Sequence, residues 1–355
     1  MIDSILDQPL SLWQTEGTLD KEHIVLSSRI RLARNFKGIA FTNRDKEDAL
    51  EKVDTMMRRV PSLLTKVDGK SYSDISLDKL SGIEREVLVE KHLVSPNLVE
   101  RVNHRSVIIS DDGAVAIMVN EEDHIRIQSM AAGLDLTKAY ERAVQIDDAI
   151  ESTYDYAFSE KFGYLTACPT NVGTGMRASV MLHLPALAIT GKLNRVVRSI
   201  IQLGYSVRGL YGEGSEGLGN IYQVSNQVTM GISEEDTIAQ LNKIIEGLIK
   251  EEEKARQSIA REHSDAFEDR VWRAYGVLAH ARKLSGAEAL SLLSDVQLGI
   301  DMGILHMKSN AFFDKLVVIT RPNFLSKYAG QDSMTADERD AYRAKVVRDA
   351  LNIEQ

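Results

Sequence analysis

Three consecutive carboxylates and an arginine stand close together in the run Asn120-Glu121-Glu122-Asp123-His124-Ile125-Arg126. To its left, two apolar runs, 107–109 and 114–119, flank the turn sequence Asp111-Asp112-Gly113, which predicts a β-hairpin. To its right, 125–128 alternates apolar with polar residues, which predicts a third strand with Arg126 on its polar face. The acidic run would then form the next turn, with its carboxylates and a guanidinium at one end of a sheet.

An acidic run on its own is more often a solvated turn, but two glycine-rich segments favour a functional interpretation. The single cysteine, Cys168, precedes a loop rich in glycine and hydroxyl groups that ends at Arg177. A second loop, 208–217, carries Arg208 and two glutamates. Glycine lets the backbone approach phosphate oxygens closely and arginines neutralise them, so these loops favour a polyphosphate ligand.

Arg29 and Arg31 add two more cations, because a period of two places them on the same face of a probable strand. The chain contains neither a Walker motif nor the set of motifs that marks protein kinases. The common nucleotide-binding folds are therefore disfavoured, and another fold must hold the phosphate groups.

Four motifs occur in the order found in the ATP:guanidino phosphotransferase (phosphagen kinase) family: Ser-Arg-Ile-Arg at 28–31, Asn-Glu-Glu-Asp-His-x-Arg at 120–126, Cys-Pro-Thr-Asn-x-Gly-Thr-Gly at 168–175 and Arg-Ala-Ser-Val at 177–180. The chain most closely resembles the bacterial protein-arginine kinase branch of this family, over about residues 20 to 254. The resemblance implies that ATP binds with Mg²⁺, which phosphates and water would mainly hold. The ATP-binding residues that it implies are Ser27, Ser28, Arg29, Ile30, Arg31, His92, Arg126, Arg177, Ala178, Ser179, Val180, Met181, Arg208, Gly209, Leu210, Tyr211, Gly212 and Glu213.

An arginine side chain stays protonated at neutral pH, so its nitrogen becomes a nucleophile only when a base removes a proton. Glu122 is the predicted base, and a second carboxylate from the 208–217 loop would hold the other side of the guanidinium. Glu213 has the family's spacing from Arg208, whereas Glu216 is the alternative because this loop is longer than in kinases of small guanidines. Phosphoryl transfer passes through a loose transition state, so alignment and charge neutralisation would supply most of the catalysis.

Cys168 is a poor candidate for a covalent phosphate carrier in such a reaction. The resemblance implies that its thiolate orients the substrate guanidinium electrostatically. A buried, inert thiol is the alternative interpretation of a single cysteine.

Composition limits the class of protein. The 355 residues suffice for two domains, and a formal net charge of −9 argues against nucleic-acid binding while suiting basic, arginine-bearing protein substrates. The first residues lack the features of a signal peptide, and no run reaches transmembrane length. We therefore expect a cytoplasmic protein without membrane contact.

The elements between the motifs predict an α+β domain over 1–254, with a mostly antiparallel sheet flanked by helices. A capping box, Ser81 with Glu84, opens a helix through about residue 93, with His92 at its end. Asn43 is predicted to cap a helix over 44–59 that stops near Pro61. Further helices are expected over 135–151 and 193–203, and a strand over 178–184.

Residues 255–355 are predicted to form an all-helical domain for dimerisation and for recognition of proteins. A long helix begins after Ser233, and capping boxes start helices at Ser285 and Thr335. Seven apolar residues exceed what one small bundle obviously buries, which favours a homodimer: Val296, Leu298, Ile300, Met302, Ile304, Leu305 and Met307.

Kinases of small guanidines carry a helical domain before the Ser-x-Arg-x-Arg segment, and that domain helps to enclose the substrate. In this chain the segment begins by residue 27. We therefore expect an open site that accepts an arginine within a polypeptide. The resemblance also implies a protein activator, protein-degradation machinery and a role in the bacterial stress response and protein quality control. A free-arginine kinase and a non-catalytic, nucleotide-binding adaptor for phosphoarginine-bearing clients are the alternatives.

The last predicted site lies in the tail at Arg339, Asp340, Arg343 and Ala344. On spacing alone this is a self-paired, solvated helix face. The resemblance implies instead an allosteric phosphoarginine site, in which arginines bind the phosphoryl group and Asp340 binds the guanidinium.

Overall fold

The computed structural model describes residues 2–16, 23–44, 46–209, 217–307, 312–331 and 333–352. The chain divides into two compact units, which are described separately. The first unit comprises Met1–Thr18, Ser27–Val180 and Ser225–Asn242, and the second comprises Leu19–Leu26, Met181–Val224 and Lys243–Gln355. None of the helices in the described ranges is both long enough and apolar enough to cross a membrane.

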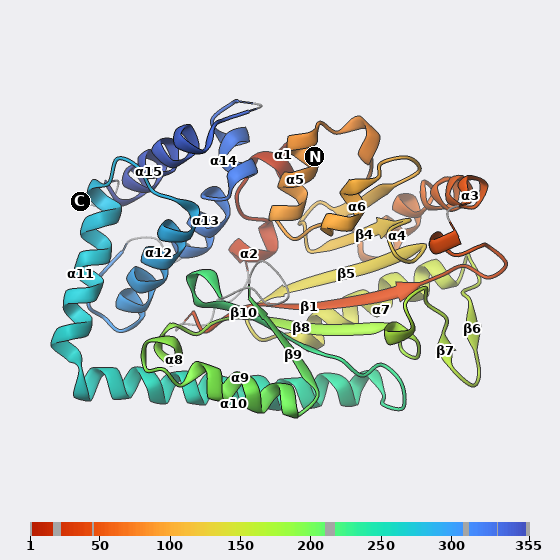
Figure 1. The fold of residues 1–355 in the computed structure, drawn as a ribbon. Helices are drawn as coiled ribbons and strands as arrows, with labels where there is room; N and C mark the ends of the chain where they lie inside the picture. Colours follow the sequence, from red (N-terminus) through yellow and green to blue (C-terminus); the bar gives the residue numbers. More distant parts are fainter. Residues whose placement is uncertain are drawn as a thin grey trace. The chain divides into compact units, whose positions relative to one another are not determined.

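Eight strands form one sheet in the order β2-β3-β4-β5-β1-β8-β10-β9 (Figure 1). Their bounds are Val25–Arg34 (β1), Tyr72–Ser76 (β2), Ser106–Ser110 (β3), Val115–Val119 (β4), Ile125–Ala132 (β5), Met176–His183 (β8), Tyr205–Gly209 (β9) and Ile221–Asn226 (β10). The pairs from β2 to β1 are antiparallel. The predicted hairpin and the third strand after it are confirmed as β3, β4 and β5.

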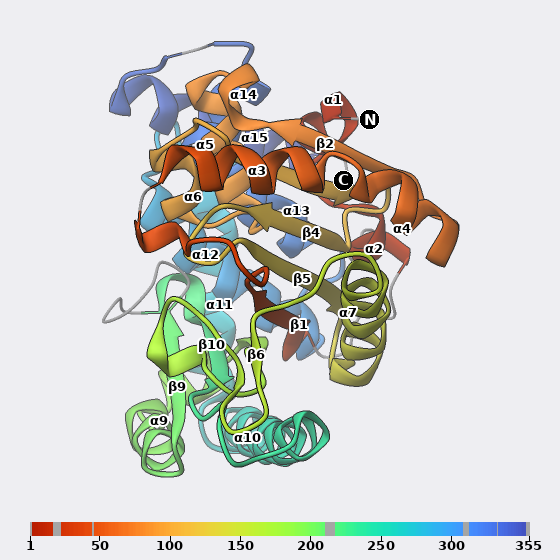
Figure 2. The same cartoon turned by 90° about the vertical axis from the view of Figure 1, so that its right-hand side faces the viewer.

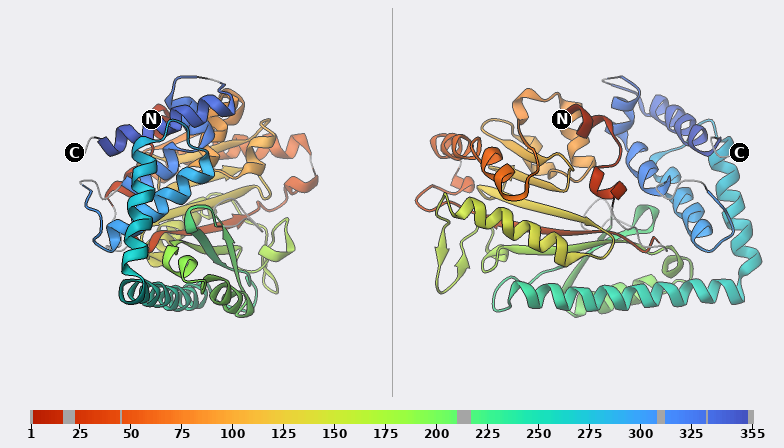
Figure 3. Two further views of the ribbon diagram at one scale, coloured as in Figure 1. Left: turned by 60° about the vertical axis from the view of Figure 1, so that its left-hand side comes forward. Right: turned by 180° about the vertical axis from the view of Figure 1, so that it is seen from behind.

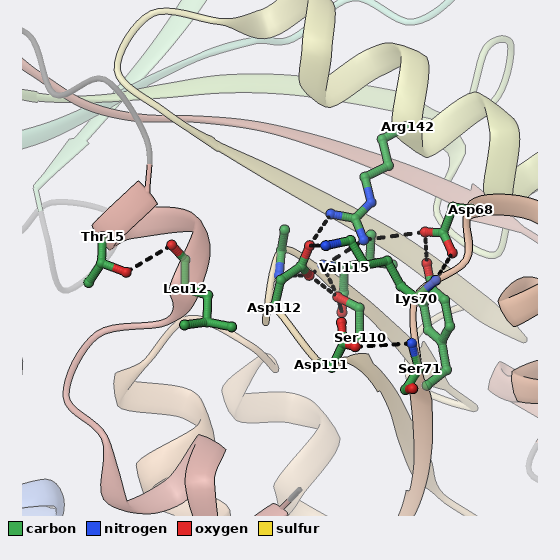
Figure 4. Close-up of polar contacts among 12 residues, drawn as sticks. Leu12, Thr15, Asp68, Lys70, Ser71, Ser110, Asp111, Asp112, Val115 and Arg142 are labelled. Carbon is green, nitrogen blue, oxygen red and sulfur yellow. Dashed lines mark hydrogen bonds and ion pairs between the residues drawn. The ribbon is translucent and has the colours of Figure 1, made fainter.

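The turn between β3 and β4 is held by charges from distant parts of the first unit (Figure 4). Arg142 donates from Nη1 to Asp112 Oδ2 at 2.7 Å, and its Nη2 lies 3.3 Å from Asp68 Oδ2. Within the turn, Ser110 Oγ donates to Asp112 Oδ1 at 2.6 Å. Asp112 of the predicted turn sequence is therefore an ion-pairing residue as well as a turn former.

Helices cover the sheet in the first unit: α1 (Ile2–Asp7), α2 (Leu12–Glu16), α3 (Glu47–Met57), α4 (Val60–Asp68), α5 (Gly82–Glu90), α6 (Pro96–Glu100) and α7 (Leu136–Glu151). The capping box of Ser81 with Glu84 at the start of α5 is confirmed. Helix α7 lies along β5 and buries Ala139, Ala143 and Ile146 (Figure 2). Strands β3 and β4 are buried at every position, so the core lies on both sides of the sheet.

The predicted cap at Asn43 is wrong. Asn43 lies in the 3₁₀ turn Thr42–Arg44, and α3 begins at Glu47 after Lys46, which makes no side-chain capping bond. The predicted helix over 44–59 is confirmed as α3, which ends at Met57 shortly before Pro61, and Pro61 itself lies in the first turn of α4. Proline is tolerated there because the first turn leaves its N–H groups without helical partners.

The second unit carries the helices α8 (Pro185–Ile189), α9 (Leu193–Gln202), α11 (Ser264–His280), α12 (Gly286–Asp301), α13 (Phe312–Ile319), α14 (Pro322–Tyr328) and α15 (Ala336–Asn352). The helical C-terminal region is confirmed, and α11 lies beside both α12 and α15 (Figure 3). Gly299 permits the close approach of α11, because a Cβ atom there would lie 2.4 Å from Val271 Cγ1. Thr335 and Glu338 exchange the hydrogen bonds of a capping box, as predicted.

Helix α10 (Glu234–Glu262) is continuous through residue 254, where the domain boundary was placed, and that boundary stays a prediction. The seven apolar residues that favoured a homodimer offer no fully exposed surface. Val296, Leu298 and Leu305 are buried, and the other four are half-buried. None of the seven is fully exposed, and the homodimer also stays a prediction.

Candidate active site

Two adjacent antiparallel strands bring three arginines to one face of the sheet in the first unit. The register sets Arg31 opposite Gln128 and Ala33 opposite Arg126, so Arg29, Arg31 and Arg126 point to the same side. Strand β8 lies on the other side of β1, where Arg29 Nε donates to Ser179 Oγ at 3.2 Å. Arg177 is close enough to influence both Arg29 and Arg31.

These arginines repel one another. Burial, together with the charges of Arg126 and Arg177, lowers the pKa of Arg29 to about 10. Burial and the neighbouring arginines lower the pKa of Arg31 well below its usual value, and Glu121 only partly opposes them. Within the described residues, Arg31 Nε is buried and has no hydrogen-bond partner. The face therefore carries positive charge that suits a polyanion.

Gln128 links this face to the residue predicted to lie beside the nucleotide. Its Oε1 accepts from Arg29 Nη1 at 3.5 Å, and its Nε2 donates to the carbonyl oxygen of His92 at 2.7 Å. His92 follows α5 with a left-handed φ of 58°. The Gln128 amide thus joins Arg29 to the turn that carries His92.

The remaining predicted ATP-binding residues lie on both faces of the sheet and belong to both units. Ser28 and Ile30 alternate with the arginines and are buried, and Ser28 Oγ donates to the Gly133 carbonyl at 2.8 Å. Ser27, Ala178, Ser179 and Val180 are also buried, while Arg208, Gly209 and Met181 belong to the second unit. Leu210, Tyr211, Gly212, Glu213 and the alternative Glu216 lie outside the described residues.

The carboxylates of the acidic run have three separate surroundings. Glu121 is buried, forms an ion pair with Arg126 and accepts from Ser95 Oγ at 2.7 Å. The Glu122 side chain is 40% exposed, and its Oε2 lies 3.6 Å from Arg126 Nη2. Glu122 is therefore the member of the run whose carboxylate is available to a second guanidinium.

Asp123 connects the acidic turn to the cysteine loop. Its Oδ1 accepts from the backbone N–H of Ala167 and from Asn35 Nδ2, both at 2.6 Å. Burial raises the pKa of Asp123, against these two hydrogen bonds. Asp123 follows Glu122 in the sequence, and Ala167 precedes Cys168. The hydrogen bond between Asp123 and Ala167 therefore fixes the acidic turn beside the start of the cysteine loop.

Backbone geometry fixes the acidic turn further. Asn120 has a left-handed φ of 57°, and its N–H donates to the His124 carbonyl at 2.8 Å. His124 Nδ1 accepts from the Phe36 N–H at 2.9 Å, so its Nε2 is the atom that donates to the Ala40 carbonyl. Burial lowers the pKa of His124, which therefore acts as a neutral structural residue.

Cys168 is a half-buried free thiol at the start of the 3₁₀ turn Pro169–Asn171. Its Sγ lies 3.0 Å from Thr170 Oγ1. The thiol is therefore not the fully buried, inert group of the alternative interpretation. It is partly accessible from solvent.

The tail cluster belongs to the second unit and is held together by backbone carbonyls. Arg343 is 3% exposed and donates to the carbonyl oxygens of Thr320 and Leu284 at 2.8 and 2.7 Å. Its Nη1 also lies 2.5 Å from Asp340 Oδ1, while Arg339 donates to the Met334 carbonyl at 2.6 Å. Ala344 is fully buried, so this is not a solvated helix face.

Sequence reasoning missed the residues that support the site. Glu121, Asp123, Asn35 and Gln128 hold the arginines and the acidic turn in place, yet none was singled out for that work. The acidic run could be seen in the sequence. The separate roles of its three carboxylates depend on partners such as Ala167 that are far away in sequence.

Among the described residues, no group of three or more His, Cys, Asp or Glu side chains is arranged to hold a metal ion. A cation that arrives with a polyphosphate needs no such group, because phosphate oxygens and water complete its coordination. The arginine face fits a polyphosphate, since its buried Arg31 Nε needs an acceptor.

Two family models match the chain in succession. The model described as ATP:guanido phosphotransferase, C-terminal catalytic domain, matches residues 54–255. The model described as Protein-arginine kinase McsB C-terminal domain matches residues 264–355. Together they cover the acidic turn, the cysteine loop, the tail cluster and, of the arginine face, Arg126 and Arg177, whereas Arg29 and Arg31 precede the matched residues.

Curated proteins and solved structures agree with the family models. A protein-arginine kinase of Bacillus cereus (strain G9842) is 45% identical over 356 residues, covering 100% of this chain and 99% of that protein. One of Bacillus mycoides (strain KBAB4) is 45% identical over 354 residues, with the same coverage. A crystal structure of lombricine kinase has a TM-score of 0.58 at 24% identity, covering 69% of each chain, which shows a common fold.

Proposed function

The chain belongs to the ATP:guanido phosphotransferase family and is a protein-arginine kinase, and we propose that it transfers the γ-phosphoryl group of MgATP to arginine side chains with Glu122 as the base. The observation that carries the assignment of the site is the crowding of Arg29, Arg31, Arg126 and Arg177 beside an acidic turn that leaves Glu122 exposed. Cations gathered without enough counter-charge favour a polyanion, and a partly exposed carboxylate next to them favours a guanidinium.

ATP would lie along the arginine face. Arg29 and Arg31 would hold phosphate oxygens, and Arg31 Nε would gain the acceptor that it lacks among the described residues. Arg177 and, from the second unit, Arg208 are the further phosphate-binding residues that we propose. His92, held through its carbonyl by Gln128, would lie by the nucleotide.

The target guanidinium would lie between the acidic turn and the cysteine loop. Glu122 would take a proton from one of its nitrogens, and that nitrogen would attack the γ-phosphorus as the bond to the bridging oxygen of ADP breaks. Glu213, with Glu216 as the alternative, would hold the other side of the guanidinium. Cys168 would orient the group electrostatically as a thiolate, without forming a bond to phosphorus.

Mg²⁺ would neutralise charge on the phosphate oxygens when it is bound. The chain's own arginines would share that task from the opposite side and exclude water from the oxygens. Alignment and charge neutralisation would then supply most of the rate enhancement, as expected for a loose transition state.

The tail cluster is our proposed phosphoarginine site, with Arg339 and Asp340 as the contacts that remain accessible. Both side chains are half-exposed, whereas Arg343 is already engaged by two carbonyls. Binding there would be allosteric, with a phosphorylated arginine of another subunit or of a client as ligand. The same proposal includes a homodimer, a protein activator, protein-degradation machinery, a role in stress response and a cytoplasmic location.

The decisive test is the identity of the product and its dependence on Glu122. Incubation of an arginine-rich protein with MgATP should give an acid-labile, comparatively base-stable phosphoramidate, measured by phosphorus NMR and mass spectrometry. Glu122→Gln should lower kcat about 10²–10⁴-fold, because an amide cannot accept the proton, while ATP affinity and Tm stay near wild type.

Glu86→Gln, an exposed carboxylate on α5, is the matched control and should leave kcat unchanged. Phosphate found mainly on serine or threonine would overturn the reaction, and a near wild-type rate for Glu122→Gln would overturn the choice of base. Equal or better kcat/KM for free arginine than for arginine in a protein would favour the free-arginine alternative. Nucleotide binding without any turnover would favour the non-catalytic adaptor.

A further inference from the structure

A groove of about 340 Å³ lies in the first unit and is lined by the hairpin of β6 (Phe158–Ser159) and β7 (Gly163–Tyr164) and by the segment that leads into α10. Figures 1 and 2 label the hairpin and α10. Its lining includes Phe158, Phe162 and Met230. These side chains are 56%, 46% and 50% exposed, and Val228 close by is 56% exposed. Large apolar side chains gathered in this way mark an interaction surface more often than a feature of folding.

Hydrogen bonds join one wall of the groove to the cysteine loop. Thr229 Oγ1 donates to the carbonyl oxygens of Thr170 and Val172 at 2.9 and 2.8 Å, and the Thr174 N–H donates to the Thr229 carbonyl at 2.9 Å. These bonds fasten the loop that begins at Cys168 to the wall that carries Met230. A ligand in the groove is therefore held at a fixed position relative to Cys168.

Two glycines bring the three segments into backbone contact. A Cβ atom on Gly173 would lie 2.1 Å from the Thr229 carbonyl oxygen, and one on Gly163 would lie 2.4 Å from the Gly173 carbonyl oxygen. Both glycines also have positive φ, of 117° and 78°. The hairpin, the cysteine loop and the 229–231 segment thus meet without side chains between them, and the aromatic rings of the hairpin are left to line the groove.

We propose that this groove binds an apolar side chain of the protein substrate, a few residues away from the target arginine in an extended segment. The proposal rests on the proposed function, because a polypeptide that delivers an arginine to Cys168 and Glu122 must cross the surface that adjoins the cysteine loop. Aromatic and methionine side chains suit this task, since they offer large contact area and adapt to different partners.

Two of the residues that line the groove carry opposite charges. Lys161 Nζ lies 5.1 Å from the centre of the Phe162 ring, and Glu234 lines the groove and accepts from Tyr140 at 2.7 Å. An apolar lining that also includes a cation and a carboxylate matches a polypeptide segment in which an apolar residue has polar neighbours. The occupant expected is therefore a mixed segment with one aromatic or aliphatic residue.

Synthetic peptides test this directly. Each peptide carries one arginine in a Gly/Ser background, with one phenylalanine placed at successive positions on either side, and kcat/KM is measured from phosphoarginine formation. At the position where the phenylalanine reaches the groove, its burial should raise kcat/KM about tenfold. The gain should come from a lower KM. The double variant Phe158→Ser/Phe162→Ser should lose that gain and keep the wild-type kcat/KM for the all-Gly/Ser peptide.

Val67→Ser is the matched control, since Val67 is 45% exposed in the same unit and lies outside the groove, and it should keep the gain. Met230→Ser should lose part of the gain by itself. No positional gain in the wild type, or a gain retained by the double variant, overturns the proposal. Loss of activity toward the all-Gly/Ser peptide would also overturn it, because the hairpin would then merely support the cysteine loop.

Two further outcomes distinguish failure of the proposed function from failure of the groove proposal alone. If the wild type forms no phosphoarginine on any peptide or protein, the proposed function fails and the groove proposal falls with it. If the double variant changes the oligomeric state in sedimentation experiments while the peptide preference stays, the groove binds a second copy of the chain and the substrate proposal is overturned.

Discussion

Arg31 and Arg142 are both half-buried arginines of the first unit, and they differ in the charges around them. Arg31 shares its face with Arg29, Arg126 and Arg177, whereas Arg142 lies between Asp68 and Asp112 (Figure 4). Burial and like charges lower the pKa of Arg31. Burial also opposes the charge of Arg142, but its hydrogen bonds to Asp112, the charge of Asp112 and the neighbouring Tyr72 together outweigh burial and raise its pKa.

This difference in surrounding charge indicates that Arg142 stabilises the fold and that Arg31 is suited to bind a ligand. Crowded cations cost free energy in the protein alone, and that cost is recovered only when an anion binds. A paired cation contributes its free energy without any ligand. The two arginines should therefore respond in opposite ways to the loss of their charge.

The largest effect is expected at Arg31. Arg31→Gln should lower kcat about 10²–10³-fold, the usual cost of removing one group that stabilises transition-state charge. The free energy of unfolding without nucleotide should stay unchanged or increase, because one like charge is removed. Steady-state kinetics and urea denaturation measure the two quantities, and a large loss of stability would show that Arg31 serves the fold instead.

A smaller effect, on stability only, is expected for Arg142→Met. Although burial opposes it, hydrogen bonds from Arg142 and Ser110 lower the pKa of Asp112 from 3.8 to about 2. Loss of the pair should reduce the free energy of unfolding by about 2 kcal/mol at pH 7. Turnover at 25 °C should be kept.

The pH dependence of this loss has a definite sign. A carboxyl whose folded pKa is lowered stabilises the fold above its unfolded pKa, and that contribution disappears as the pH falls through the folded pKa. The difference between Arg142→Met and wild type should thus be constant above pH 4 and shrink toward pH 2. Arg58→Met is the control, because the Arg58 side chain is 62% exposed in its pair with Asp54 and should contribute less than about 1 kcal/mol.

The smallest effect is expected in the tail of the second unit. Arg339→Ala should weaken phosphoarginine binding about tenfold, the loss expected for one charge-assisted hydrogen bond, and it should spare Tm. Lys345→Ala, an exposed cation on the same helix, should leave the affinity unchanged. Calorimetry with phosphoarginine measures both, and equal affinities in the two variants would remove Arg339 from the site. Arg343 is unsuitable for this test because its buried guanidinium holds the Thr320 and Leu284 carbonyls.

Local signals in the sequence were read correctly where the structure depends on neighbours in the chain. The Asp111-Asp112-Gly113 turn, the capping box at Ser81 and the shared face of Arg29 and Arg31 all depend on spacings of a few residues. Asn43 failed as a cap because a competing 3₁₀ turn uses that residue, and helix propensity alone does not reveal the competition.

Distant contacts were not predictable in the same way. Glu121, Glu122 and Asp123 have almost the same chemistry, and their separate roles arise from Ser95, Arg126 and Ala167, which the fold brings to them. The groove was equally hidden, because Phe158, Phe162 and Met230 carry no motif and become a surface only when the two segments meet.

The hydrogen bonds of Thr229 also have a consequence for a chain that is still being synthesised. Synthesis proceeds from the N-terminus, so Glu122, Cys168 and the arginines of the site leave the ribosome well before residue 229. The cysteine loop lacks its bonds from Thr229 to Thr170, Val172 and Thr174 until then. A nascent chain that ends before Thr229 carries the reactive residues of the first unit and lacks the anchor that holds its cysteine loop in shape.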